Sequence, residues 1–365
     1  MRTKVQKSRE SKVLEKANFS GKTVYVGIDV HKKLWACTVY LEEHFYKTFT
    51  QPPIGEALKT FLENHFPGAN YQSCYEAGFC GFSVHRDLER NGINCIVVNP
   101  ADVPQTAKDS LTKTDKIDSK RLATALCKGM LKAIYIPSQI DESDRKLMRY
   151  RTTVQREMAE HKRRIRSLLF TLEIKIPQEL DKPYWSKKML QWLQDLPITQ
   201  LGAKSAMDLM LDDLIHSRKK LYTVTSQIKK LSETDKYRAL MGLLRSAPGI
   251  GLIVGMTLIT EIMDINRFSN FSKFNSFVGL YPNQFSSGES TRMGKMTPRH
   301  NNYLRPLIIE AAWIAIRHDS ALALKFSEDC KRKTKKRAIV TIARKLLSRI
   351  YTVWNDGIFY QKGLR

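Results

Sequence analysis

The chain has 365 residues, and this length is too great for one ordinary hydrophobic core. Because 42% of the residues are hydrophobic, we predict two or three compact units. It carries 61 Lys and Arg against 36 Asp and Glu, and the net charge of +25 favours a polyanionic partner, first of all nucleic acid. The charge also fits a ribosome-associated or merely soluble basic protein, and it indicates no reaction. The six cysteines form no C-x-x-C pair, which argues against a structural zinc site.

The first segment, residues 1–22, is rich in Lys and Arg and is predicted to be a flexible basic arm that contacts phosphates nonspecifically. It lacks the apolar core of a secretory signal, so we expect a cytoplasmic protein. The longest weakly polar stretch, 247–260, is interrupted by Pro248 and by glycines. It is also shorter than the roughly 20 residues that cross a bilayer, so we expect no membrane span.

Residues 23–138 are predicted to form an α/β domain, because short β-rich runs there alternate with helical stretches. The first three runs read as adjacent antiparallel strands. The expected elements are, in order, strands at 24–30, 34–40 and 44–49, a helix at 54–65, a strand ending at Glu76, a helix near 82–90 and a strand at 93–98.

The middle of the chain, residues 139–236, is predicted to be an all-helical linker with two long amphipathic helices, at about 141–170 and 203–231. The apolar seam of the first helix suits either a coiled coil that joins two chains or packing within one chain. Its exposed faces carry many basic residues, Arg163 and Arg164 among them. These basic residues fit two interpretations about equally well: a surface that binds nucleic acid along the helix, or a helix that is simply solvated.

The last part, residues 237–365, is predicted to be a mostly helical domain that opens on a P-G-I-G turn between apolar segments. Gly249 and Gly251 suit a helix-hairpin-helix, in which small residues let backbone amides approach a phosphate. A tight turn inside a helical bundle explains the same residues equally well.

Four carboxylates are the strongest candidates for chemistry. Asp29 ends a buried strand in G-I-D-V-H, Glu76 closes another apolar run, and Asp115 and Asp118 lie three apart at a helix start, where both can face one way. Mg²⁺ takes oxygen ligands, and paired ions clamp both sides of an in-line phosphoryl displacement. In a basic protein the set predicts a nuclease-like site for Mg²⁺, with Mn²⁺ as a substitute.

Each carboxylate also has a simpler explanation when it is taken alone. Asp115 could cap the helix, Asp118 could interact with the helix dipole, and Glu76 could pair with an arginine. The order D, E, D-x-x-D across one strand-rich domain is what favours a shared metal site.

These residues resemble the DEDD insertion-sequence transposases, which are related to Piv-type invertases. The N-terminal domain of that family is similar to the RuvC Holliday-junction resolvase and has an RNase H-like fold. Asp29, Glu76, Asp115 and Asp118 match its four acidic positions. The resemblance implies that the chain is an enzyme that cleaves and rejoins DNA for insertion-sequence mobility, with a divalent metal.

The segment 277–305 looks like the family's G-L-x-P…S-G…G…L-R block. Ser287, immediately before Gly288, matches its catalytic serine, while the neighbouring Ser286 leaves open which hydroxyl is the nucleophile. Without the resemblance, a serine beside glycine in a polar loop is simply a turn former. One departure concerns Arg299-His300-Asn301, where the family commonly has a glycine, and it predicts a different local turn.

The resemblance further implies a covalent phosphoserine at Ser287, so that rejoining needs no ATP. Arg292, Lys295, Arg299 and Arg305 could then neutralise charge on the scissile phosphate, or simply contact the nucleic-acid backbone. Family members are guided by a structured noncoding bridge RNA and form a dimer of dimers with composite active sites. A nucleoid-associated prokaryotic protein is implied as well.

Four other functions fit parts of the sequence. A metal-only nuclease or junction resolvase would use water as the nucleophile, and a site-specific invertase would use the same residues on a fixed pair of sites. A sugar kinase or chaperone-type ATPase also carries G-I-D before a hairpin, but no glycine-rich phosphate loop follows Asp29. A non-catalytic nucleic-acid-binding protein requires that the acidic residues be structural.

Overall fold

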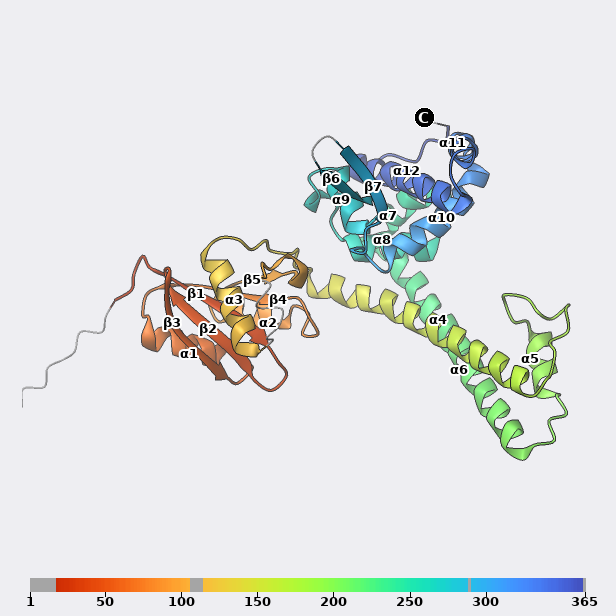
Figure 1. Cartoon of the computed structure of the whole chain (residues 1–365), viewed down its shortest axis with the longest axis horizontal. Coiled ribbons are helices and arrows are strands. Elements are labelled where there is room, and N and C mark those ends of the chain that lie inside the picture. Colours follow the sequence, from red (N-terminus) through yellow and green to blue (C-terminus); the bar gives the residue numbers. More distant parts are fainter. Residues whose placement is uncertain (1–17, 106–113, 288–289, 364–365) are drawn as a thin grey trace, which may run out of the picture. The chain divides into compact units, whose positions relative to one another are not determined.

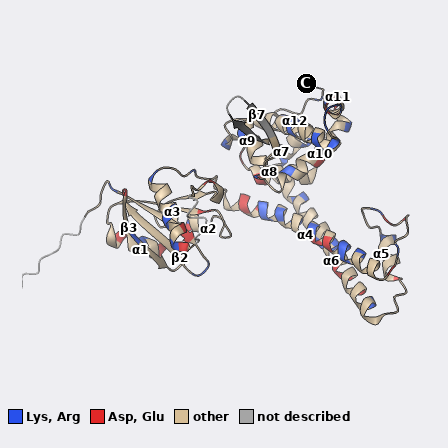
Figure 2. Ribbon diagram, viewed as in Figure 1, with Lys and Arg blue, Asp and Glu red and all other residues tan. Residues whose placement is uncertain are grey.

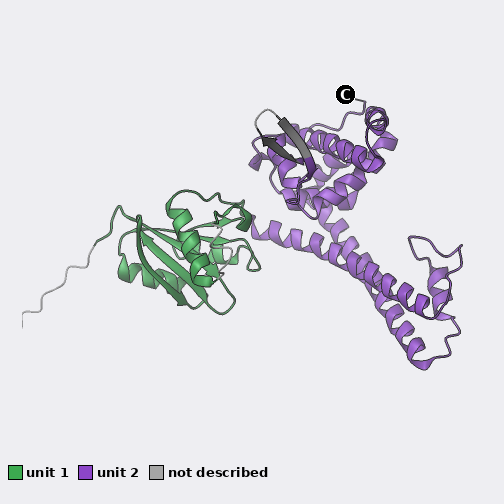
Figure 3. Ribbon diagram, viewed as in Figure 1, with its two compact units in different colours: residues 1–136 green, residues 137–365 purple. Residues whose placement is uncertain are grey.

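A computed structural model of the chain describes residues 18–105, 114–287 and 290–363, with only the backbone considered for the strand residues between 283 and 293. The chain divides into two compact units, residues 1–136 and 137–365 (Figure 3). The predicted helical region, 139–236, and the predicted C-terminal domain, 237–365, both fall within the second unit. Most of the predicted basic arm, up to residue 17, lies outside the described residues.

The first unit is a mixed five-stranded sheet with helices on both faces (Figure 1). Its strand order is β3-β2-β1-β4-β5, in which β1, β2 and β3 are antiparallel neighbours and β4 and β5 run parallel to β1. The prediction of an α/β domain that begins with three antiparallel strands is confirmed, and the sheet is consistent with an RNase H-like fold. Its elements are β1 (Thr23–Val30), β2 (Trp35–Leu41), β3 (His44–Gln51), α1 (Gly55–His65), β4 (Asn70–Glu76), α2 (Ser83–Arg90), β5 (Asn94–Val98), the 3₁₀ helix η1 (Pro100–Asp102) and α3 (Asp115–Cys127).

The two faces of the sheet follow from the alternation of side chains along β1. Val26 and Ile28 are fully buried in one cluster with Leu58 of α1 and Leu88 of α2. Gly27, on the opposite face, lies under α3, where a Cβ atom at this position would come within 2.2 Å of a backbone nitrogen and 2.3 Å of a backbone oxygen of that helix. Only glycine therefore permits α3 to lie this close to β1.

The second unit begins with a long helical pair, in which α6 runs alongside α4 (Figure 1). Part of the apolar seam of α4 packs within the chain, because Ile165 and Leu169 are buried against Met207 and Leu211 of α6. Its elements are α4 (Gln139–Thr171), α5 (Lys187–Gln194), α6 (Leu201–Ser232), α7 (Asp235–Arg245), α8 (Leu252–Ile262), η2 (Ile265–Arg267), α9 (Phe271–Val278), β6 (Pro282–Ser287), β7 (Ser290–Met296), α10 (Leu304–His318), α11 (Ser320–Cys330) and α12 (Lys335–Asp356).

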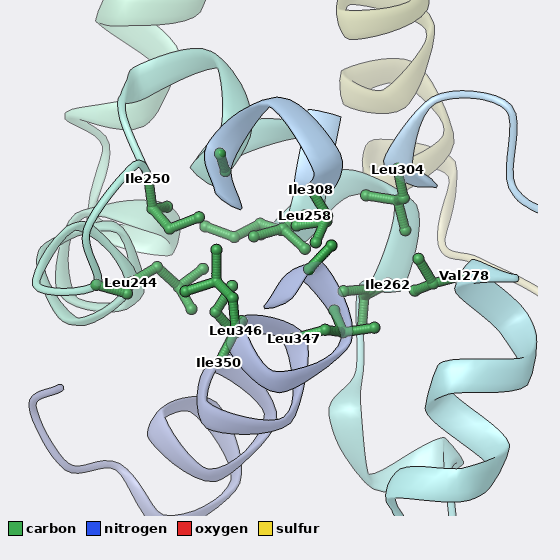
Figure 4. Packing of buried hydrophobic residues seen from close by; sticks show 14 of the residues in the cluster. Leu244, Ile250, Leu258, Ile262, Val278, Leu304, Ile308, Leu346, Leu347 and Ile350 are labelled. Carbon is green, nitrogen blue, oxygen red and sulfur yellow. The ribbon is translucent and has the colours of Figure 1, made fainter. Parts of the chain in front are cut away.

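The core of this unit lies where α7, α8, α9, α10 and α12 meet (Figure 4). Leu258, Ile308 and Leu346 are fully buried there. The P-G-I-G turn joins α7 to α8 and packs on α10, since Gly249 has φ of +83° and a Cβ there would lie 2.4 Å from the carbonyl oxygen of Ala311. Close packing accounts for Gly249, whereas a Cβ at Gly251 would meet nothing within 4 Å.

No strands were predicted around Ser287, where the sequence suggested a polar loop. β6 and β7 form a two-stranded antiparallel sheet, with Ser287 opposite Ser290. Cross-strand pairing supplies the backbone hydrogen bonds that the local sequence does not suggest.

Within the described residues, none of the helices is both long and apolar enough to cross a membrane.

Candidate active site

Asp29 and Glu76 lie side by side because β1 and β4 are parallel neighbours. Ile28 is paired with Tyr75, so the next residue on each strand is an acid. Tyr75 is buried on the α1 and α2 side of the sheet, which directs Glu76 to the opposite side, toward α3. Both side chains are partly exposed, 25% for Asp29 and 30% for Glu76, as befits the open edge of a sheet.

The other two acids come from the start of α3. Thr114 caps this helix by accepting a hydrogen bond from the backbone N–H of Ile117 at 3.4 Å. The cap is therefore Thr114, and Asp115 and Asp118 are first-turn residues. Because Gly27 lets α3 lie directly on β1, this first turn is held beside the ends of β1 and β4.

Three residues form what we call the His31 cluster: Asp29, His31 and Asp115. The Nε2 atom of His31 lies 3.2 Å from Oδ2 of Asp29 and 3.4 Å from Oδ1 of Asp115. One potential ligand atom from each of the three residues lies within 4.8 Å of the others. His31 was not predicted as a site residue, although it stands two residues after Asp29 in the same motif.

Three further residues form the Arg121 cluster: Glu76, Asp118 and Arg121. The Nη2 atom of Arg121 donates to Oε1 of Glu76 at 2.9 Å and lies 3.2 Å from Oδ1 of Asp118. Arg121 stands three residues after Asp118, on the same face of α3, and its side chain is only 13% exposed. The expectation that Glu76 could pair with an arginine agrees with this contact, yet the arginine also reaches a second acid of the set.

Electrostatics links the two clusters. Burial raises the pKa of Asp29, and the negative charges of Asp115 and Asp118 raise it further, while His31 opposes the shift. A raised pKa means that the ionised carboxylate is disfavoured in this environment. A bound cation would relieve that cost, so the site is electrostatically suited to a positive ion.

The serine hairpin is described at the level of its backbone. Ser287 is the last residue of β6, and the neighbouring pairs of the hairpin are Ser286 with Thr291 and Phe285 with Arg292. The side chains of Ser286, Ser287 and Arg292 lie outside the described part of the chain. The register assigns Ser287 to the end of the hairpin, next to the connection between its strands.

The basic residues predicted near the serine differ in their surroundings. Arg305 donates through Nη1 to the carbonyl oxygens of Gly279 at 3.2 Å and Thr297 at 2.7 Å, so this contact is structural. Lys295 and Arg299 are exposed. A different local turn was predicted at Arg299-His300-Asn301. His300 lies close to Gly279 there, since a Cβ at Gly279 would be 2.3 Å from the Cβ of His300.

Lys and Arg recur along α4 (Figure 2). The predicted contacts Arg163 and Arg164 are both exposed, and both pair with Glu160 of the same helix. Ion pairs on a helix surface are weak, so these side chains remain available to a nucleic-acid phosphate.

A cavity of about 310 Å³ lies at the P-G-I-G turn and includes Gly249 and Gly251 in its lining. Three basic side chains also line it, Arg245, His318 and Lys362. Gly251 is the N-cap residue of α8, and the backbone N–H of an N-cap residue has no partner inside its own helix. The cavity therefore combines hydrogen-bond donors with positive charge.

The C-terminal segment carries Lys362 to this cavity. The hydroxyl of Tyr360 donates to Asp319 at 2.8 Å, and Arg349 donates to the same carboxylate oxygen at 2.8 Å. The backbone N–H of Tyr360 donates to Oγ of Ser246 at 2.8 Å, beside the turn. These contacts fix the segment two residues before Lys362.

Comparison with known families shows similarity at both ends of the chain. Residues 26–172 match a family model described as a transposase, of the DEDD IS110 class. Residues 241–328 match a model described as the transposase IS116/IS110/IS902 family. The first match contains all four carboxylates, and the second contains the serine hairpin.

Individual relatives are similar over most of the chain. The transposase for insertion sequence element IS1533 of Leptospira borgpetersenii is 25% identical, over 80% of this chain and 84% of the relative. The putative transposase y4rJ of Sinorhizobium fredii is 29% identical, over 78% and 76%. The putative transposase y4qE of the same organism is 28% identical over 66% of this chain, but the match spans only 57% of that relative.

Proposed function

Since the chain belongs to the IS110 family of DEDD transposases, we propose that it cleaves and rejoins DNA strands to move an insertion sequence. The class to which it belongs consists of enzymes that transfer DNA strands and bind DNA. The observation that carries the proposal is the gathering of Asp29, Glu76, Asp115 and Asp118 at one sheet edge of a strongly basic chain. Scaffolding alone does not require four acids in one place, because like charges repel.

A DEDD domain implies a divalent metal, and the residues fit one. The carboxylates of Asp29 and Asp115 and the imidazole of His31 offer ligand atoms within 4.8 Å of one another. We propose Mg²⁺, which is bound by one or two carboxylates together with substrate phosphate, and Mn²⁺ as a substitute. When bound, the ion would supply Lewis-acid stabilisation of charge on the phosphate.

The protein's own nucleophile is proposed to be the hydroxyl of Ser287. Its oxygen forms a bond to phosphorus as the bond to the leaving DNA oxygen breaks, the serine proton is lost and the leaving oxygen takes one up. The hydroxyl of a second strand then attacks the phosphoserine and releases the serine. The number of phosphoester bonds is conserved, which explains why rejoining would need no ATP.

Basic side chains would hold the nucleic acid. Lys295, Arg299, Arg163 and Arg164 are exposed and suit backbone contacts, whereas Arg305 is engaged with backbone carbonyls. We also propose a structured noncoding guide RNA and an assembly of two dimers. The net charge of +25 supports a nucleic-acid partner that the protein contacts through its phosphates. Base pairing between guide RNA and DNA would then supply the sequence recognition.

A metal-only nuclease or resolvase is the second candidate. It is favoured by the fact that the acids, His31 and Arg121 contact one another within the first unit. In that case water is the nucleophile and no covalent protein–DNA species forms. An invertase would use the same residues on a different pair of DNA sites.

The deciding experiment uses the full chain with the guide RNA encoded beside its gene and both DNA substrates. We expect recombination in Mg²⁺, none in EDTA, and an adduct between protein and DNA that survives denaturant. Ser287→Ala should abolish adduct and recombination, while the matched variant Ser286→Ala should retain both. DNA cleavage by Ser287→Ala without any covalent adduct, together with loss of cleavage in Asp29→Ala, would favour the metal-only alternative, whereas an adduct that persists in Ser287→Ala and disappears in Ser286→Ala would move the nucleophile to Ser286.

A further inference from the structure

Arg121 bridges two carboxylates, whereas Arg149 of the second unit donates to both oxygens of a single carboxylate, Glu261. Within the described residues, the side chain is held by two carboxylates of the candidate metal site, and its buried Nε atom has no hydrogen-bond partner. Arg305 of the second unit, by contrast, donates to two backbone carbonyls. The guanidinium of Arg121 thus serves the acids rather than the scaffold around it.

The position of this guanidinium competes with a metal ion. An ion bridging Glu76 and Asp118 would need oxygen contacts of about 2.0–2.1 Å. Nη2 of Arg121 already lies 2.9 Å and 3.2 Å from one oxygen of each carboxylate. An ion on the remaining oxygens would still face a charge that arginine cannot lose by deprotonation.

The His31 cluster presents the opposite situation. Asp115 is 65% exposed and His31 is 50% exposed, whereas Asp118 is 14% exposed. Imidazole binds metals through a neutral nitrogen, so His31 can be a ligand where arginine cannot. The acidic set is therefore divided into a pair beside His31, Asp29 and Asp115, which can take an ion, and a pair beside Arg121, Glu76 and Asp118, which already holds a cation.

We propose that Arg121 stands in place of a second divalent cation, so that the acidic site binds one ion, at Asp29 and Asp115. This inference rests on the proposed metal-dependent function. Arg121 is then a positioning residue: its positive charge offsets the repulsion between Glu76 and Asp118 and holds the two side chains close together without a second ion. The site departs in this way from the two-ion clamp that four carboxylates suggest.

The test counts bound Mn²⁺ on the full-length protein by electron paramagnetic resonance, without any measurement of activity. Wild type should bind one Mn²⁺ per chain and give the six-line spectrum of an isolated ion. Arg121→Gln, which removes the charge, should bind two, with a spectrum broadened by coupling between ions about 3.5–4 Å apart. Arg121→Lys restores the charge and should bind one, as should Arg90→Gln, a control at an arginine that is 76% exposed in the same unit.

Two ions on wild type, or one ion on folded Arg121→Gln, would overturn the inference. A second variant decides the matter if Arg121→Gln does not fold. Glu76→Gln should keep its Mn²⁺ affinity within about tenfold of wild type, whereas Asp29→Asn should lose more than about 100-fold. A large loss in Glu76→Gln would contradict the proposed location, and no Mn²⁺ on wild type would instead overturn the proposed metal use itself.

Discussion

The two units differ in how they surround a carboxylate that is fully or partly buried. In the second unit, Glu261 is 2% exposed and is fully engaged: Arg149 donates to both of its oxygens, at 2.7 and 2.8 Å, and Asn301 donates to one at 2.9 Å. In the first unit, Asp29 lies among other acids, and burial raises its pKa. An acid whose charge is satisfied stabilises the fold, and one whose charge is disfavoured is available to a cation.

The largest expected effect comes from Asp29→Asn. Strand transfer should fall by on the order of 10³-fold or more, because a ligand to the proposed ion is lost. Stability without metal should instead rise. A carboxyl whose pKa is raised above its ordinary value of 3.8 destabilises the fold as the pH rises through that shifted pKa.

Thermal melts in EDTA check the sign of this change in stability. The melting temperatures of wild type and Asp29→Asn should coincide at a pH below 3.8 and diverge toward neutral pH, with the variant the more stable. A variant less stable than wild type at neutral pH would show that Asp29 is a structural acid like Glu261.

The next effect tests how the acids are brought together. Gly27→Ala should cost more than about 3 kcal/mol, because the added Cβ would collide with the backbone of α3 rather than with a movable side chain. Gly78→Ala is the matched control, since the nearest atom to its new Cβ lies at 3.8 Å. Equal stability of the two variants in denaturant titrations would contradict the close packing of α3 on β1.

The sequence allowed the acidic half of the site to be predicted, because strand ends and helix starts are local features. Asp29 and Glu76 close apolar runs, and D-x-x-D opens a helix. Arg121 could not be predicted, since it lies 45 residues from Glu76 and only the sheet register and Gly27 bring them together. The strands around Ser287 were missed because serine, glycine and asparagine favour turns, and pairing with 290–296 overrides that preference.

The third prediction concerns the satisfied acid. Glu261→Gln removes a buried negative charge and leaves Arg149, whose side chain is 40% exposed, without its counter-charge, which should cost roughly 2–3 kcal/mol. For a unit of this size that corresponds to a fall in melting temperature of roughly 5–10 °C. Melting followed by near-ultraviolet circular dichroism measures it, and an unchanged melting temperature would remove the contrast with Asp29.

The smallest expected effect concerns the cavity at the P-G-I-G turn. Lys362 is held there by the contacts of Tyr360, and it lines the cavity with Arg245 and His318. If the cavity takes one backbone phosphate, Lys362→Ala should weaken nucleic-acid binding a few-fold for all sequences alike. The slope of log K against log salt should fall by about 0.9, the share of one released counterion.

Lys345→Ala, at an exposed lysine of α12 outside the cavity, should leave that slope closer to wild type. An unchanged slope for Lys362→Ala would mean that the glycines serve only the packing of the turn, as the close approach of Gly249 to Ala311 already requires.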